Sequence, residues 1–117
     1  MYRKPIPITW ENDPRTYASS GSNYGQISVD LTAPGTDVYS TYQSTYRALS
    51  GTSMATPFVA GVAGLLKAQN SNLTHLQIKQ ILLQTTDYLA DFEGKSATEG
   101  RLNAHKALTA VSGFALQ

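Results

Sequence analysis

The sequence predicts an α/β fold in which short strands come first and helices dominate the second half. The strand candidates mix β-branched and aromatic residues with polar ones and end at turn formers such as Pro and Gly. Apolar residues then recur in longer runs that suit helices. With 117 residues, of which 41% are hydrophobic, the chain suits one domain and is not disordered.

Two short strands and a hairpin are expected in the first half of the chain. Strand candidates cover residues 6–10 and 27–31, and the segment between them, 11–26, is rich in Asn, Ser, Gly and Pro, as surface loops are. Residues 38–42 and 46–49 carry β-branched and aromatic side chains and are separated by three polar residues. This pattern predicts a β-hairpin.

Three helices are expected after the hairpin. Residues 53–66 contain no charged side chain, which predicts a helix that is buried on every side and too short to span a bilayer. Thr74 and Gln77 have the spacing of a capping box at the start of a second, amphipathic helix. Residues 104–111 are rich in Ala and predict the third helix.

The first of these helices must begin at or very near Ser53. Pro57 has no N–H and cannot donate to the carbonyl of Ser53, four residues earlier. Ser53 is therefore expected at a helix N-terminus, where unpaired N–H groups and the helix dipole favour developing negative charge. Gly51 permits close approach of the backbone. These features suit a nucleophile, although a hydroxyl at Thr52 or Ser53 could also serve only as an N-cap.

The residues around Ser53 carry a resemblance to a known family. Residues 51–57 (GTSMATP), followed by VAG at 59–61, closely resemble the serine signature of the subtilisin-like serine proteases. Residues 22–25 (SNYG) and 29–35 (VDLTAPG) are similar to further stretches of that family, in the same order. The resemblance covers residues 20–111 and leaves residues 1–19 as a divergent segment. It implies the C-terminal part of a three-layer αβα catalytic domain with a parallel sheet, the hairpin preceding the serine helix.

This resemblance implies a role for each residue of the serine segment. Ser53 would be the nucleophile of a serine endopeptidase that hydrolyses peptide bonds through an acyl-enzyme, and its own N–H would help to hold the oxyanion. Ser50, Gly51 and Thr52 would border the pocket for the substrate residue before the scissile bond. The expected substrate is a polypeptide.

The remaining catalytic groups of the family are not found at matching positions. In the family the Asp, the His and the oxyanion Asn all precede the serine, and the chain has no His before its serine. Asp30 and Asp37 match positions where the family has structural residues. The resemblance therefore implies that the triad Asp and His and the oxyanion Asn lie outside this chain, and we expect the isolated chain to be inactive.

Two alternatives remain open at this point. The chain could be an inactive truncated homologue that acts as an interaction or assembly module through its exposed apolar surface. It could also be a self-sufficient hydrolase that uses His75 or His105, both of which follow the serine.

Composition and packing bear on possible partners. Nine Lys and Arg against eight Asp and Glu give a net charge of +1, so we expect neither a nucleic-acid nor a membrane partner. Charged residues make up 15% of the chain, against about 25% in typical soluble domains, so part of the surface should be covered. Gly61 and Gly64 would allow a close neighbour on the first helix. We expect that neighbour to be the missing N-terminal part of the catalytic domain or a partner chain.

Cofactor and compartment are less constrained. With no Cys, the chain has neither a disulfide framework nor a thiolate nucleophile. We expect no cofactor in this chain, whereas calcium, common in the family, is possible in the full domain. No signal peptide is recognisable at the start of the sequence, and a secreted or extracellular location would follow only from the tendency of the family.

Overall fold

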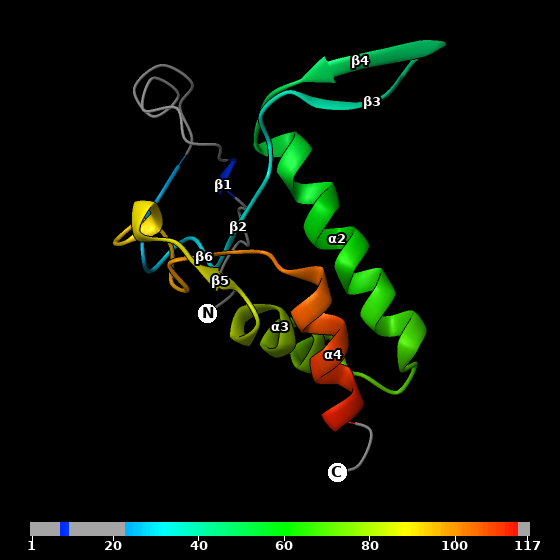
Figure 1. The fold of residues 1–117 in the computed structure, drawn as a ribbon, viewed down its shortest axis with the longest axis vertical. Helices are drawn as coiled ribbons and strands as arrows, with labels where there is room; N and C mark the ends of the chain where they lie inside the picture. Colours follow the sequence, from blue (N-terminus) through cyan, green and yellow to red (C-terminus); the bar gives the residue numbers. More distant parts are fainter. Residues whose placement is uncertain (1–7, 10–22, 115–117) are drawn as a thin grey trace.

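The computed structural model describes residues 8–9 and 23–114. They form a small sheet, a projecting hairpin and a group of helices (Figure 1). The strands are β1 (Ile8–Thr9), β2 (Thr32–Ala33), β3 (Val38–Tyr42), β4 (Thr45–Leu49), β5 (Asp87–Tyr88) and β6 (Gly100–Arg101). The helices are α2 (Thr52–Gln69), α3 (His75–Gln84), the short 3₁₀ helix η1 (Ala90–Phe92) and α4 (Ala104–Phe114).

The sheet has the strand order β1-β2-β6-β5. The β1–β2 and β2–β6 pairs are parallel, and the β5–β6 pair is antiparallel. The N–H of Leu102 donates to the carbonyl of Thr32 at 2.8 Å, and the Thr32 hydroxyl donates to the carbonyl of Gly100 at 2.9 Å. The predicted α/β class, with parallel strands, is therefore confirmed.

The predicted hairpin is confirmed, whereas one predicted strand is wrong. The hairpin pairs Val38 with Leu49 and closes through the two residues 43 and 44. Residues 27 and 28, the start of the strand expected at 27–31, belong to a turn over 26–28 instead, and the strand begins only at Thr32. The carbonyls of residues 29 and 30 accept hydrogen bonds from the irregular segment 97–98. Residues 29 and 30 are thus hydrogen-bonded to a loop rather than to a neighbouring β-strand. The other predicted strand, residues 6–10, is described only at Ile8–Thr9, where β1 lies.

The three predicted helices are present, and they pack against one another. The capping box is confirmed: the Gln77 N–H donates to the Thr74 hydroxyl at 3.2 Å, and the Thr74 N–H donates to the Gln77 side chain at 2.8 Å. α4 continues three residues beyond the predicted end. The core contains residues of all three helices, together with Leu31 before β2 and Leu73 between α2 and α3. Its buried members are Leu31, Val62, Leu66, Leu73, Ile81, Leu82, Ala107 and Val111. No helix in the described part of the chain is long and apolar enough to cross a membrane.

The prediction that α2 is buried on every side is wrong for this chain. Only Ala55, Val62 and Leu66 are buried, on the side that faces α3, α4 and the sheet. Leu65 is 51% exposed and Phe58 43%. The described elements cover α2 on one side only, which leaves the rest of the surface of the uncharged run 53–66 without a partner among the described residues.

Candidate active site

The start of α2 places Ser53 on the protein surface. The N-cap is Gly51, and its φ of 156° and ψ of 165° lie in a region that only glycine adopts readily. The helix begins at Thr52, so Ser53 is its second residue, close to the predicted position. No side chain caps the helix, which contradicts the alternative that a Thr52 or Ser53 hydroxyl serves as the cap.

Two backbone donors at this helix start remain available. The carbonyl of Gly51 accepts from the N–H groups of Met54, at 3.0 Å, and Ala55, at 3.4 Å. The N–H groups of Thr52 and Ser53 have no acceptor among the described residues. Because the first N–H groups of a helix carry its partial positive charge, this position favours an anion or a developing oxyanion.

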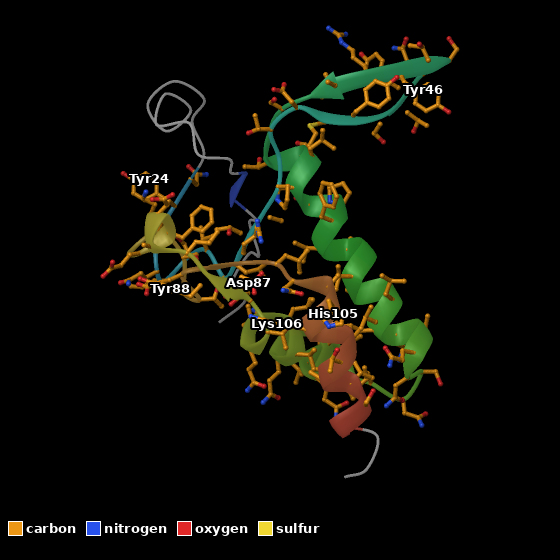
Figure 2. All side chains as sticks on the ribbon, in the orientation of Figure 1. Tyr24, Tyr46, Asp87, Tyr88, His105 and Lys106 are labelled. Carbon is orange, nitrogen blue, oxygen red and sulfur yellow. The ribbon has the colours of Figure 1, made fainter. Side chains whose placement is uncertain are left out.

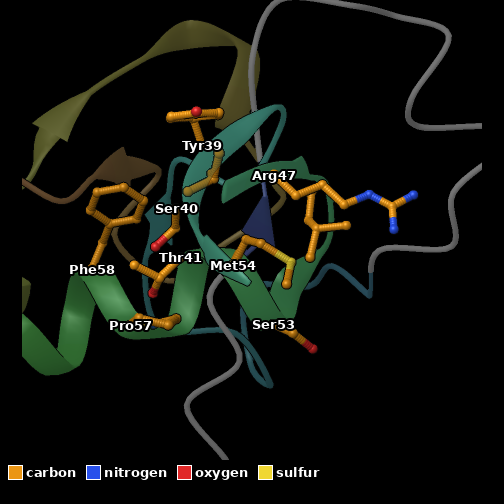
Figure 3. A pocket seen from close by; sticks show the side chains of 10 residues that line it. Tyr39, Ser40, Thr41, Arg47, Ser53, Met54, Pro57 and Phe58 are labelled. Carbon is orange, nitrogen blue, oxygen red and sulfur yellow. The ribbon is translucent and has the colours of Figure 1, made fainter. Parts of the chain in front are cut away.

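A groove of about 450 Å³ runs between the hairpin and the first turns of α2 (Figure 3). Among the four labelled residues of α2, Ser53 and Phe58 lie farthest apart, and the Ser53 hydroxyl points away from the Phe58 ring. Apart from Arg47, the residues that line it are uncharged. The lining comprises Val38, Tyr39, Ser40, Thr41, Arg47 and Leu49 of the hairpin and Ser53, Met54, Pro57 and Phe58 of α2.

Ring contacts order the hairpin side of this groove. Tyr39 and Tyr46 stack with their ring centroids 5.8 Å apart, and the Arg47 guanidinium lies 5.5 Å from the centre of the Tyr42 ring. The sequence predicted the hairpin, but it did not predict that the hairpin flanks Ser53. The short connection could have indicated this arrangement, because only two residues separate the end of β4 from the start of α2.

The segment before Ser53 is held by the loop that precedes the hairpin. The Asp37 N–H donates to the Ser50 hydroxyl at 2.8 Å, and that hydroxyl donates to the Asp37 carboxylate at 3.4 Å. The Gly51 N–H donates to the carbonyl of Gly35 at 2.7 Å. Ser50, Gly51 and Thr52 do not line the groove beside Ser53, so their predicted place at a substrate pocket stays a prediction.

Neither histidine accompanies Ser53. His75 is the first residue of α3 and follows the far end of α2, which is 18 residues or about 27 Å long. His105 lies in the first turn of α4, away from the start of α2 (Figure 2). Neither residue lines the groove. This arrangement gives no support to a self-sufficient hydrolase that uses one of these two imidazoles as its base.

Comparison with known proteins identifies the family. The sequence model of the subtilase family matches residues 8–107. The chain belongs to the subtilase family. The predicted resemblance to the subtilisin-like serine proteases is therefore confirmed.

Individual subtilases resemble the chain over most of its length. It is 48% identical to thermitase of Thermoactinomyces vulgaris over 104 residues, which is 88% of the chain and 35% of thermitase. It is 40% identical to a thermophilic serine proteinase of Bacillus sp. (strain AK1), over 88% of the chain and 27% of that protein. A chain of the subtilase cytotoxin superposes with a TM-score of 0.74 at 30% identity, over 80% of this chain and 30% of that one. The chain thus spans about a third of the length of the subtilases it matches, and its fold is that of a subtilase portion.

The two aspartates before the serine have local partners in this subtilase chain. Asp30 is buried, and its carboxylate pairs with the Lys79 ammonium of α3 at 2.9 Å. Asp37 pairs with Ser50, as described above. Each carboxylate therefore ties one loop to another element.

Within residues 8–9 and 23–114, no three His, Asp or Glu side chains gather in a way that could hold a metal ion.

Proposed function

We propose that this chain supplies the nucleophile of a serine endopeptidase, with Ser53 as the attacking residue. The observation that carries the proposal is the start of α2, where an exposed Ser53 hydroxyl adjoins the groove and two N–H groups lack acceptors among the described residues. Membership of the subtilase family supports protease chemistry in general. The substrate is a polypeptide.

The reaction would proceed through an acyl-enzyme. The Ser53 oxygen attacks the scissile carbonyl carbon while a histidine from outside this chain takes the hydroxyl proton. The carbonyl oxygen becomes an oxyanion, to which the Ser53 N–H donates, together with an asparagine from outside this chain. The C–N bond then breaks, the amine leaves with the proton from the histidine, and water hydrolyses the ester in a second, equivalent step.

The complementary part of the catalytic domain would pack on the uncovered face of α2. Phe58 and Leu65 are the large apolar side chains exposed along this helix. A Cβ added at Gly61 or Gly64 would meet nothing within 4 Å in the described part of the chain, so both positions leave room for a close neighbour. β1 is the end strand of the described sheet, where further parallel strands could add.

A second candidate function is an interaction or assembly module without catalysis. It is favoured by the distance of both histidines from Ser53 and by the same uncovered face of α2. The two candidates differ in what happens when the complementary part is present: an enzyme portion becomes reactive at Ser53, whereas a module only binds.

A serine-reactive fluorophosphonate probe tests both. The 117-residue chain alone is expected to label no faster than its Ser53→Ala variant, since neither His75 nor His105 lines the groove beside Ser53. Mixed or fused with a segment that carries the subtilase Asp, His and oxyanion Asn, the parent is expected to label and to hydrolyse a peptide, and the variant is not. Binding without labelling would favour the module. Rapid Ser53-dependent labelling of the chain alone would contradict the proposal that the catalytic histidine lies outside this chain.

A further inference from the structure

We propose that Asp37 is a positioning residue for Ser53 and acts through Ser50 and Gly51. The two hydrogen bonds between Asp37 and Ser50, together with the bond from Gly51 to Gly35, are called the Asp37–Ser50 staple below. This role rests on the proposed function of Ser53 as nucleophile. It assigns Asp37 and the Ser50 hydroxyl to holding the helix start rather than to touching substrate.

The staple closes the open end of the hairpin. Asp37 directly precedes β3 and Ser50 directly follows β4, so the staple lies one residue beyond the terminal Val38–Leu49 pair. The Ser50 hydroxyl accepts from the Asp37 N–H at 2.8 Å and donates to its carboxylate at 3.4 Å. Both hydrogen-bonding functions of that hydroxyl are thus used within the chain.

Gly51 makes such a staple necessary. Its backbone conformation is one that glycine alone adopts readily, and glycine has many alternatives, so Gly51 does not fix the direction of the chain by itself. Its N–H is fixed by the carbonyl of Gly35 at 2.7 Å, and its carbonyl accepts from the first turn of α2. The staple therefore sets where α2 begins, and with it the orientation of the Ser53 N–H and hydroxyl.

Asp37 occupies a strained conformation at this point. Its φ is 50°, a left-handed region that costs free energy for residues other than glycine and that Asn and Asp tolerate best. Strain of this kind persists where the surrounding contacts over-determine it, and it gathers at functional sites. Here the contacts are those with Ser50, three residues before the nucleophile.

Four variants of the completed catalytic domain separate positioning from general stability. Asp37→Gly keeps the left-handed backbone but removes the carboxylate, and Asp37→Asn keeps both the backbone preference and an acceptor oxygen for Ser50. Ser50→Ala removes the hydroxyl. Gln26→Ala is the matched control, because it removes an exposed hydrogen bond of 3.0 Å between two loops, to Glu99, with no connection to α2.

The expected result is a change in turnover rather than in substrate binding. Asp37→Gly and Ser50→Ala should each lower kcat by about 5- to 10-fold with KM changed less than about 2-fold, because small misplacement of a nucleophile slows the chemical step. The double variant should be little worse than either single one, since both remove the same contact. Asp37→Asn should restore kcat to within about 2-fold of the parent, and Gln26→Ala should leave it unchanged.

Two results would overturn the positioning role. One is a kcat for Asp37→Gly equal to that of the parent, and the other is a rise in KM for Ser50→Ala with kcat retained, which would mean that the hydroxyl contacts substrate.

Hydrogen exchange in the 117-residue chain keeps this test separate from that of the proposed function. Faster exchange of the Gly51 amide in Asp37→Gly than in Asp37→Asn is expected, and equal exchange would overturn the staple. If the completed parent hydrolyses no peptide, the proposed function fails, and the exchange result alone then decides whether the staple orders the start of α2.

Discussion

The two ends of α2 differ in how completely this chain surrounds them. At the C-terminal end, Leu66 is fully buried among residues of α3 and α4. At the N-terminal end, Ser53 is exposed beside a groove, and Phe58 one turn later is 43% exposed. The chain therefore builds its own core at one end of the helix, whereas near the other end Ala55 is buried and the side chains of Ser53 and Phe58 are left exposed.

If Ser53 is the nucleophile as proposed, the two ends of α2 affect different quantities: the packed end affects the free energy of unfolding, and the exposed end affects catalysis. A substitution at the packed end should change the free energy of unfolding of the chain by itself. A substitution at the exposed end should do little to the chain alone and should be felt in the completed catalytic domain. Each of the following comparisons tests that separation, in order of decreasing expected effect.

Ser53→Ala should have the largest effect, and only on activity. In the completed domain it should lower the rate of peptide hydrolysis by at least about 10³-fold, since the attacking oxygen is lost. The free energy of unfolding of the 117-residue chain should change by less than about 0.5 kcal/mol, because the side chain is exposed and does not cap the helix. Hydrolysis assays and urea unfolding measure the two quantities. Retained hydrolysis would remove Ser53 from the mechanism.

Leu66→Ala and Leu65→Ala compare two adjacent leucines that point about 100° apart around α2, one buried and one half exposed. Leu66 is fully buried, so its truncation should cost about 2–5 kcal/mol in the chain alone. Leu65 is 51% exposed, and its truncation should cost less than about 1 kcal/mol. Urea unfolding of the chain gives both values. In the completed domain, Leu65→Ala should weaken association with the complementary part, and an unchanged affinity would mean that this side of α2 stays uncovered.

The sequence predicted the elements well where the pattern reflects local chemistry. The Thr74–Gln77 capping box and the hairpin depend on neighbouring residues alone, and both are present. The first turn of α2 could also be placed, because Pro57 limits where that helix begins. The serine segment could be assigned to a family only from the full motif at residues 51–57 and 59–61, since a hydroxyl at a helix start is by itself most often a cap.

The remaining differences come from contacts that no local pattern reveals. The alternation at residues 27–31 suggested a strand, but residues 97–98 take the carbonyls that a neighbouring strand would need. The uncharged run 53–66 predicted a helix buried on every side, but the described residues cover α2 on one side only. The Asp37–Ser50 staple joins residues 13 apart and leaves no mark in the pattern of hydrophobic residues.

Gly100→Ala and Gly64→Ala compare a crowded glycine with an open one. A Cβ at Gly100 would lie 2.8 Å from the Thr86 Cβ and 3.0 Å from the Asp87 carbonyl oxygen, so the β5–β6 pair would have to shift. The expected cost is about 1–3 kcal/mol. A Cβ at Gly64 meets nothing within 4 Å in the described residues, and Ala should stabilise the helix by up to about 1 kcal/mol in the chain alone. Thermal unfolding compares the two. If Gly64→Ala also leaves association with the complementary part intact, no close neighbour packs at that position.

The smallest effect is expected at Asp87, which lies in β5 close to the start of α4 (Figure 2). This region, together with the core that α3 and α4 form with α2, is called the packed half below. Its carboxylate accepts from Lys106 at 2.6 Å and from Asn103 at 2.9 Å, and the hydrogen bond from Lys106, followed by that from Asn103, holds the pKa of Asp87 below its ordinary value of 3.8. Because the folded-state pKa is depressed, the carboxylate stabilises the fold above about pH 4, and this contribution is lost as the pH falls below that value.

Asp87→Asn tests that contribution. It should lower the urea midpoint slightly at pH 7 and make the midpoint fall less between pH 5 and pH 3 than it does in the parent. Salt should narrow the difference at pH 7, because the Lys106 side chain is 54% exposed and its charge is screened. His105→Ala, on the same turn of α4, is the control and should leave the acid limb of the curve unchanged. Parallel curves for Asp87→Asn and the parent would show that the ionised carboxylate adds nothing to the packed half. The Asp87 cluster would then have no part in the contrast between the two ends of α2, and the burial of residues such as Leu66 would account for more of it.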